Sequence, residues 1–374
     1  MTRQIYLDYN ATAPMRPRAI EAVAASLVQA GNPSSVHRFG RLARRAVEGA
    51  REAVARAVGA TPAEILFVSG GSEANNMVLK GVGRAHVLVS AIEHDSVLAA
   101  APGERIPVDR EGAVDVAALE RMLGADPRPA LVSVMLANNE TGAIQPIADI
   151  VRVARARGAV VHCDAVQALG RIEFDLHALD VDFASLSAHK LGGPMGVGAL
   201  YVRDGAALSA QIVGGGQERG LRAGTPNLPG IVGFGVVAQQ ASDDLRDMTR
   251  IRGLRDRLEA GIKRLQPSVR IFAENVERLP NTSCFAVAGF GAETQVIALD
   301  LAGIAVSAGA ACSSGRVQSS HVLRAMGTDA ELAGSAIRVS LGWQNEERDI
   351  DEFLTAWGAL LACHATDRPV ETAA

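Results

Sequence analysis

The sequence has few of the residues that build disulfide-rich, metal-binding or nucleic-acid-binding proteins. It contains only four cysteines, Cys163, Cys284, Cys312 and Cys363. They form no CxxC pair or Cys/His cluster, which argues against a disulfide framework and against metal ligation by this chain. The formal net charge is only −4, so no basic surface indicates a nucleic-acid partner. We expect no metal site and no direct contact with nucleic acid.

Long apolar runs are missing as well. No run approaches the ~18 residues that a transmembrane helix needs. Residues 1–10 are polar and charged, without the apolar region of a signal peptide. We therefore expect a cytoplasmic protein that does not contact a membrane.

Aromatic residues make up only 4% of a chain that is 48% hydrophobic, which favours close packing of helices on a sheet through small side chains. Short apolar runs alternate with segments of helical spacing such as residues 147–157. This alternation predicts a mostly parallel sheet with helices on both faces. The runs predicted as buried strands are residues 65–69, 87–91, 131–137, 160–163, 183–186 and 199–202.

The length of 374 residues predicts two domains, because single cores stop growing near ~250–300 residues. Residues 36–58 have the pattern of an amphipathic helix, and a long charged helix is predicted over 243–265, after the Gly/Pro-rich stretch 214–230. Strand-like segments at 281–287, 304–308 and 337–341 then predict a smaller α/β domain. We expect an N-terminal segment (1–15) that packs on the small domain, a large domain (16–245) and a small C-terminal domain (246–374).

Lys190 and Asp164 carry the clearest chemical signal. Lys190 follows a strand-like run and precedes glycines, while Asp164 and Gln167 lie just after another strand. A lysine that forms a Schiff base and an acid that holds a pyridinium nitrogen are the two fixed partners of pyridoxal phosphate. Taken alone, Lys190 fits a solvated surface lysine as well.

Two further segments have a functional and a structural interpretation. Residues 67–76 run from a strand through Gly70 and Gly71 into a helix, which forms an anion site with the Ser72 hydroxyl or a tight turn capped by Ser72. His94 follows the next strand and is a catalytic side chain or a hydrogen-bonded loop histidine.

Arg338 and Cys312 stand out from their surroundings. A guanidinium inside an apolar strand needs an anion, and either a substrate carboxylate or a structural carboxylate of the protein would serve. Cys312 lies in a Gly/Ser-rich run, residues 307–315, where Arg316 and His321 follow and favour a thiolate. A nucleophile and an inert loop cysteine are equally compatible with that position.

Together these residues resemble the cysteine desulfurases, a branch of the class V, fold-type I pyridoxal phosphate enzymes, and the subgroup with a long cysteine loop in particular. The similarity runs from residue 6 to about residue 355. The segments that carry it are residues 6–14, 31–35, 69–73, 93–94, 138–142, 164–167, 187–190, 214–225 and 311–313.

The resemblance implies a role for each matching position. Lys190 would bond to the cofactor aldehyde, His94 would stack on the ring and act in catalysis, Asp164 would pair with the ring nitrogen, and Gln167 would bind the ring oxygen. The residues implied at the phosphate are Gly71, Ser72, Ser187, His189 and, from a partner subunit, Thr225. Those implied near the substrate are Asn139, which also touches the cofactor, Arg338 on the carboxylate, and Asn32. Cys312 would be the nucleophile.

The implied activity converts L-cysteine to L-alanine. Sulfur passes to a persulfide on Cys312 and then to an acceptor protein, such as an iron–sulfur scaffold or a thiolation system. The implied assembly is a homodimer. Alternatives are a selenocysteine lyase, another class V aminotransferase or lyase, and, from a different class, an inactive partner in sulfur transfer. The sequence departs from the commonest family pattern at Ser72, at residues 316–318 and in the short tail beyond residue 361. These differences leave the sulfur acceptor open. Whether Cys312 ligates an iron–sulfur cluster in a complex is open as well.

Overall fold

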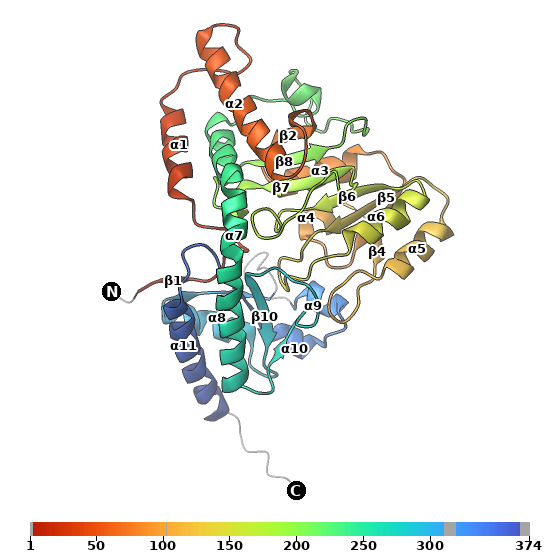
Figure 1. Ribbon diagram of the computed structural model, residues 1–374. Helices are drawn as coiled ribbons and strands as arrows, with labels where there is room; N and C mark the ends of the chain where they lie inside the picture. Colours follow the sequence, from red (N-terminus) through yellow and green to blue (C-terminus); the bar gives the residue numbers. More distant parts are fainter. Residues whose placement is uncertain (1–2, 102, 310–318, 367–374) are drawn as a thin grey trace.

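The computed structural model describes residues 3–101, 103–309 and 319–366. It divides into a large sheet with its helices and a smaller mixed region, joined along one long helix (Figure 1). The strands of the large sheet are β2 (Ile65–Val68), β3 (His86–Ser90), β4 (Glu104–Ile106), β5 (Ala130–Met135), β6 (Val160–Asp164), β7 (Phe183–Ser187) and β8 (Gly198–Val202). Its helices are α1 (Pro17–Leu27), α2 (Arg38–Ala57), α3 (Gly71–Gly81), α4 (Asp95–Leu98), α5 (Val116–Ala125), α6 (Ile147–Ala156) and α7 (Leu228–Leu265).

The large sheet has the strand order β2-β8-β7-β6-β5-β3-β4. Its pairings are parallel except those of β8, which runs antiparallel to both β2 and β7. The predicted mostly parallel α/β fold is thus confirmed, and all six predicted strands are present. The edge strand β4 was not predicted, because two of its three residues are exposed charged side chains without an apolar pattern.

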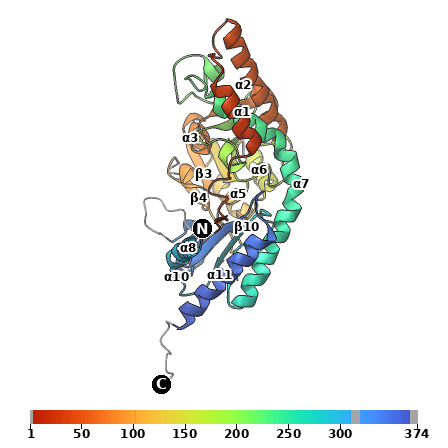
Figure 2. The ribbon, with the colours of Figure 1, turned by 90° about the vertical axis from the view of Figure 1, so that its left-hand side faces the viewer.

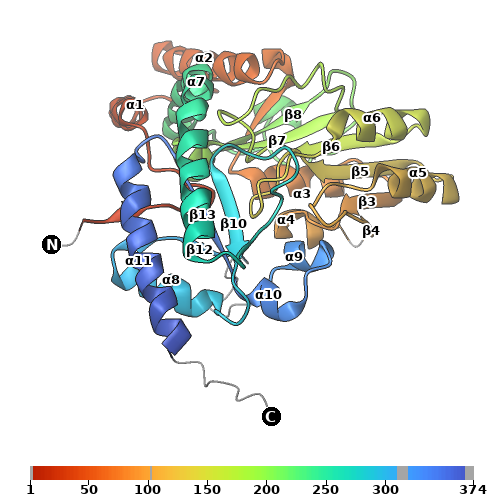
Figure 3. The same ribbon diagram turned by 60° about the horizontal axis from the view of Figure 1, so that its bottom comes forward.

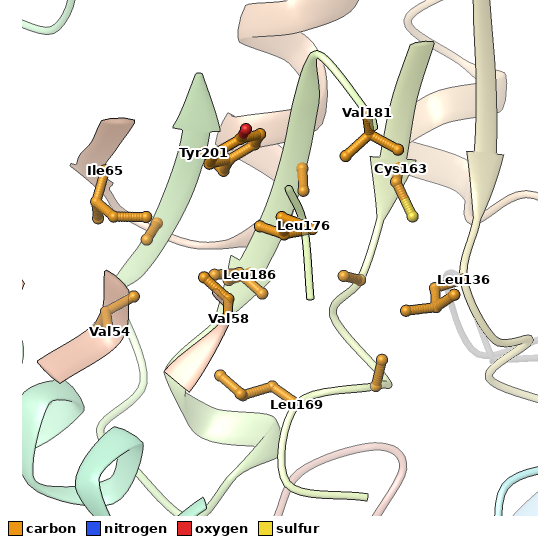
Figure 4. Close-up of a cluster of buried hydrophobic side chains, with 14 of the residues drawn as sticks. Val54, Val58, Ile65, Leu136, Cys163, Leu169, Leu176, Val181, Leu186 and Tyr201 are labelled. Carbon is orange, nitrogen blue, oxygen red and sulfur yellow. The ribbon is translucent and has the colours of Figure 1, made fainter. Parts of the chain in front are cut away.

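Both faces of this sheet are buried. In β2, Ile65 and Phe67 belong to the core that contains α2, α6 and the first half of α7, whereas Leu66 and Val68 pack with α3 on the other face. Figure 4 shows the first of these cores, where Val54 and Val58, at the end of α2, pack with strand side chains that include Ile65 and Leu186. Burial on both faces explains why these strands appear in the sequence as short continuous apolar runs.

Helix α7 spans 38 residues and belongs to both halves of the molecule. Its first half contributes Phe234 and Val237 to the large core, and its second half contributes Leu254 and Leu258 to a second core. In Figure 2, α1 and α2 lie along the upper part of α7, and α11 (Glu347–Thr366) lies beside its lower part.

The sequence pattern placed the start of this helix too late, at residue 243. Its first turns carry Pro229 near the N-terminus, where the missing N–H costs no hydrogen bond, and glycines at helix contacts. A Cβ on Gly235 would lie 2.7 Å from Cα of Ala50 in α2, and one on Gly233 would lie 2.5 Å from Pro194. Gly233 and Gly235 therefore allow α7 to approach its neighbours closely.

The smaller region contains a four-stranded antiparallel sheet and a two-stranded parallel one. Its elements are β1 (Ile5–Tyr6), β9 (Arg270–Ile271), β10 (Thr282–Ala286), α8 (Ala292–Leu301), β11 (Ile304–Ala305), β12 (Ser307–Ala308), α9 (His321–Ala325), α10 (Ala330–Gly334), β13 (Ala336–Ser340) and α11. Figure 3 shows the sheet of β10, β12 and β13 beside α7.

The N-terminal segment lies in the smaller region although it begins the chain. Strand β1 pairs with β11, and Ile5 and Leu7 pack in the second core.

The predicted domain boundary at residues 245/246 falls inside α7, which is continuous. We propose that this boundary marks the point where α7 passes from one core to the other. Among the described helices, none has the length and hydropathy to cross a membrane.

The glycine contacts of α7 give a stability prediction. Gly235→Ala should destabilise the protein by about 1–3 kcal/mol, because the new methyl group overlaps the backbone of Ala50. Gly253→Ala, in the same helix, meets open space and should stabilise it by roughly 0.5–1 kcal/mol. Denaturant unfolding of both variants measures the difference, and equal effects would contradict the close-packing explanation.

Candidate active site

A cavity of 390 Å³ lies between the large sheet and the smaller region. The carboxyl ends of the parallel strands form one wall, which is where ligands bind in open α/β sheets. Ser307 of β12 and Arg338 of β13 close it from the other side. The predicted site residues that line it are Gly71, Ser72, His94, Asn139, Asp164, Gln167, Ser187, His189, Lys190 and Arg338.

Lys190 is held inside this cavity, so the surface-lysine interpretation is wrong. It ends a 3₁₀ turn, Ala188–Lys190, that directly follows β7. Its Nζ donates hydrogen bonds to the main-chain oxygens of Asn10 (2.5 Å) and Ala11 (2.8 Å). Burial, and then the positive charges of Arg338 and Arg171, lower the pKa of Lys190 to about 7. A large share of the amine is therefore uncharged and nucleophilic at neutral pH.

Asp164 and Gln167 are fixed at the end of the neighbouring strand β6. One Asp164 carboxylate oxygen accepts from Asn75 Nδ2 at 2.8 Å, and the other accepts from the Val166 amide at 3.0 Å. Gln167 Nε2 donates to the Asn10 carbonyl at 3.0 Å. Asn75 was not predicted from the sequence, where the only signal is an asparagine in the middle of a helix.

The start of α3 forms a cradle for an anion. Gly70 is the N-cap and no side chain caps the helix, so the interpretation of Ser72 as a cap is wrong. A Cβ on Gly71 would approach the Val166 side chain to 2.7 Å, so a larger residue would narrow this end of the cavity. Ser187 Oγ, buried beside it, has no hydrogen-bond partner among the described residues. Backbone amides at a helix start together with an unpaired hydroxyl suit a phosphate group.

Two histidines line the same cavity. His94 is the N-cap of α4, and its Nδ1 accepts from the Ser96 amide at 3.1 Å. The ring thus has the predicted loop hydrogen bond and still lines the cavity. Burial, followed by the charges of Lys190 and Arg171, lowers the pKa of His189 to about 4. His189 is therefore a neutral hydrogen-bonding group at physiological pH.

Arg338 pairs with a structural carboxylate of the protein, which is one of the two kinds of anion that would satisfy its position. Its Nη2 donates to Asp8 Oδ1 at 2.6 Å, and its Nη1 donates to the main-chain oxygen of Asn139 at 2.9 Å. Arg338 nevertheless lines the cavity. The structure therefore gives this guanidinium a partner within the protein and also a position from which it faces a ligand.

Two buried carboxyl groups behind the cavity were not predicted. Burial raises the pKa of Glu93 to about 8 and that of Glu140 to about 7. Ser320 Oγ donates to Glu140 at 2.5 Å, and His321 Nε2 lies 2.9 Å from the main-chain oxygen of Glu93. These contacts join the loops after β3 and β5 to the start of α9. The only sequence signal was a charged residue in each of two motifs otherwise noted for His94 and Asn139.

Two predicted site residues of the described parts of the chain, Asn32 and Thr225, do not line this cavity. Cys312 lies outside the described residues. Asn32 and Thr225 are exposed. Their neighbours Pro33 and Pro226 line a separate cavity of 340 Å³ beside the middle of α2. Of the other cysteines, Cys163 and Cys284 are buried, and burial raises the pKa of each thiol. Cys363 is exposed on α11 rather than packed in a core.

The cavity contains no arrangement that suggests a bound metal. Within the described parts of the chain, no group of three or more His, Cys, Asp or Glu side chains is placed to hold a metal ion. The chemistry available is that of one reactive amine with carboxylate, amide, imidazole and guanidinium groups around it. This set suits a carbonyl cofactor with an anionic group and a ring nitrogen.

Known proteins resemble this chain over nearly its full length. The Aminotransferase class-V family model matches residues 5–353. A cysteine desulfurase of Cereibacter sphaeroides is 44% identical and is aligned over 94% of both chains. The cysteine desulfurase IscS of Dictyoglomus turgidum is 42% identical over 95% of this chain and 93% of its own. The solved NifS-like protein of Rickettsia africae has a TM-score of 0.90 and 37% identity, and the match covers 96% of this chain and 100% of that chain.

The fold is that of the fold-type I pyridoxal phosphate enzymes. The chain belongs to the aminotransferase class-V family and, within it, to the cysteine desulfurases. This confirms the resemblance inferred from the sequence. The full-length similarity to enzymes does not favour the alternatives of an aminotransferase, a selenocysteine lyase or an inactive partner.

The electrostatics of Lys190 give a prediction for the protein stripped of cofactor. Acylation by an amine-reactive reagent, followed by mass spectrometry, should label Lys190 half-maximally near pH 7, because only the uncharged amine reacts. Arg338→Gln should move this midpoint to higher pH, since it removes a neighbouring positive charge. The exposed Lys80 and Lys263 serve as internal controls. A Lys190 midpoint near the ordinary lysine pKa of about 10.4 would contradict the assigned environment.

Proposed function

We propose that this protein uses pyridoxal phosphate to convert L-cysteine to L-alanine and passes the sulfur to Cys312 and then to an acceptor protein. The observation that carries the proposal is one cavity in which the low-pKa amine of Lys190 lies with Asp164 and Arg338. An amine, an acid and a guanidinium are the groups needed for the cofactor aldehyde, the cofactor ring nitrogen and an amino-acid carboxylate.

The residues of the cavity fit this cofactor. The unpaired Ser187 hydroxyl and the space left by Gly71 at the start of α3 are suited to its phosphate, together with Ser72 and His189. Asp164 would keep the ring nitrogen protonated, Gln167 would bind the ring oxygen, and His94 would stack on the ring. When bound, pyridoxal phosphate supplies the electron sink that lets bonds at Cα and Cβ of the amino acid break.

Lys190 would hold the cofactor until the substrate amine replaces it, and its released amine would then remove the Cα proton. The carbonyls of Asn10 and Ala11, which accept from Nζ here, would orient that amine. Arg338 and Asn139 would hold the substrate carboxylate. These contacts leave the β-carbon and its sulfur free to meet the thiolate.

Cys312 would complete the reaction as the nucleophile. Its thiolate attacks the substrate sulfur, so that a sulfur–sulfur bond forms while the Cβ–S bond breaks and its electron pair remains with the carbon fragment. One proton added at Cβ, and the return of the removed proton from Lys190 to Cα, would give alanine. The outer sulfur of the persulfide would then pass to a thiol of an acceptor protein, which restores the Cys312 thiolate. The acceptors to test are an iron–sulfur scaffold protein and a thiolation enzyme. The proposed location of the reaction is the cytoplasm.

Replacing Cys312 separates the two halves of this reaction. Cys312→Ala should retain the visible absorbance of bound cofactor and its change on adding L-cysteine, but lose alanine production. With selenocysteine the variant should keep appreciable activity, because the weaker carbon–selenium bond breaks without a nucleophile. Alanine formation at the wild-type rate from L-cysteine would show that Cys312 is an inert loop residue.

Lys190→Ala is the matched control, because it removes the amine while leaving Cys312 in place. It should lower alanine production by at least about 10²–10⁴-fold with either substrate and abolish the cofactor absorbance band of the wild type.

A homodimer is supported by the segment that carries Thr225. Glu218 and Arg219 have left-handed backbone conformations, with φ of 45° and 58°, which cost energy in residues other than glycine. Glu218 accepts hydrogen bonds from Arg51 (2.7 and 2.9 Å) and from the Phe67 amide (2.9 Å). These contacts fix a loop whose exposed Thr225 does not line the cavity of its own chain. Large apolar side chains are also exposed on α1, on α2, between these two helices, and in the chain shortly before Thr225. They are Ile20, Leu27, Val28, Val36, Phe39, Leu42, Ile212 and Val213.

We therefore propose that Thr225 serves the partner's cofactor phosphate, and mixed dimers test this. Thr225→Ala alone should weaken cofactor binding about tenfold. A dimer of one Lys190→Ala chain and one Thr225→Ala chain would contain one fully native site if Thr225 acts across the interface. Half of the wild-type activity and one tightly bound cofactor per dimer are expected. A mixed dimer without a tight site, or an active monomer in sedimentation, would refute the shared site.

A further inference from the structure

The ion pair between Asp8 and Arg338 lies at the cavity but has no role so far. Arg338 is only 4% exposed, and two of its nitrogens are engaged, Nη2 with Asp8 and Nη1 with the carbonyl of Asn139. Its Nε is buried without a hydrogen-bond partner among the described residues. A guanidinium has five N–H donors in one plane. Asp8 thus fixes that plane while leaving donors for a ligand.

Asp8 is itself held by the strand that carries Arg338. It forms a parallel bridge with Ser340, two residues after Arg338 on β13. The Leu7 carbonyl accepts from the Ser340 amide at 2.8 Å, and the Tyr9 amide donates to the Ser340 carbonyl at 3.1 Å. The Tyr6 hydroxyl donates to the main-chain oxygen of Asp8 at 3.0 Å. The carboxylate therefore has a fixed place relative to the guanidinium.

We infer that Asp8 is a positioning residue that holds Arg338 in the orientation that receives the substrate carboxylate. The inference rests on the proposed function, in which Arg338 binds that carboxylate. A long arginine side chain loses about 1.5–2 kcal/mol of rotamer entropy when it is fixed, and the Asp8 contact fixes it before substrate arrives. Asp8 also opposes the effect of Arg338 on Lys190, because its charge raises the pKa of the amine while the guanidinium lowers it.

The test uses the holoenzyme and compares two ligands. Asp8→Asn keeps the shape but removes the charge, and it should raise KM for L-cysteine about tenfold, the effect of a lost charge-assisted hydrogen bond, with kcat near wild type. Binding of cysteamine, which is cysteine without its carboxylate, should be unchanged when followed by the absorbance of the cofactor. Asp8→Glu restores a carboxylate and should give a KM between those of the wild type and Asp8→Asn.

Two further variants distinguish positioning from general loosening of the N-terminal segment. In an Arg338→Lys background, Asp8→Asn should change KM little, because the two residues act as one unit. Asp349→Asn breaks the ion pair with Arg3, which ties the same segment to α11 away from the cavity, and it should leave KM for L-cysteine unchanged.

Each outcome decides the inference. A lower KM in Asp8→Asn would show that Asp8 competes with substrate for Arg338. An equal loss of cysteamine binding, an additive effect with Arg338→Lys, or the same KM increase in Asp349→Asn would show a structural role only. If the wild type binds L-cysteine but makes no alanine, the proposed function fails. The comparison of L-cysteine with cysteamine binding still decides the role of Asp8.

Discussion

The cavity depends on one short segment, residues 8–11, that lies between the two halves of the molecule. The carbonyl of Asn10 accepts from both Lys190 and Gln167 of the large domain. Its side chain donates to Thr282 of β10 and to the carbonyl of Asn139. Asp8 in the same segment holds Arg338 of β13. The segment thus adds to the contacts that Ser320, His321 and Arg338 make with the loops after β3 and β5.

The large sheet supplies the second constraint. Strands β6 and β7 are parallel neighbours, with Asp164 opposite Ser185, so that both strands end at the same edge. Asp164, Ser187 and Lys190 therefore come together although they lie in separate segments of the sequence. Parallel strands place their carboxyl ends side by side. For this reason, polar residues just after apolar runs indicated side chains that line the cavity.

The sequence predicted the features that leave a local pattern and missed those that depend on contacts between distant residues. The buried strands have strong apolar runs and were predicted correctly. Lys190 and Asp164 stand at strand ends, and the structure brings them together in one cavity. Asn10 and Asn75 act through specific hydrogen bonds that leave no periodic pattern in the sequence. The start of α7 was hidden because its glycines serve contacts with α2 and Pro194 that only the tertiary structure reveals. The role of Asp8 depends on a pairing with residues more than three hundred positions away.

Charge balance connects these observations to chemistry. Lys190, Arg171 and Arg338 crowd one buried region, and their burial and mutual repulsion lower the pKa of Lys190 to about 7 and that of Arg171 to about 9. Asp8 and Asp164 offset part of this positive charge. An excess of positive potential in this cavity favours a phosphate and a carboxylate over neutral ligands. The same excess keeps a large share of the lysine amine uncharged at neutral pH. Anion recognition and amine reactivity therefore have a single electrostatic origin.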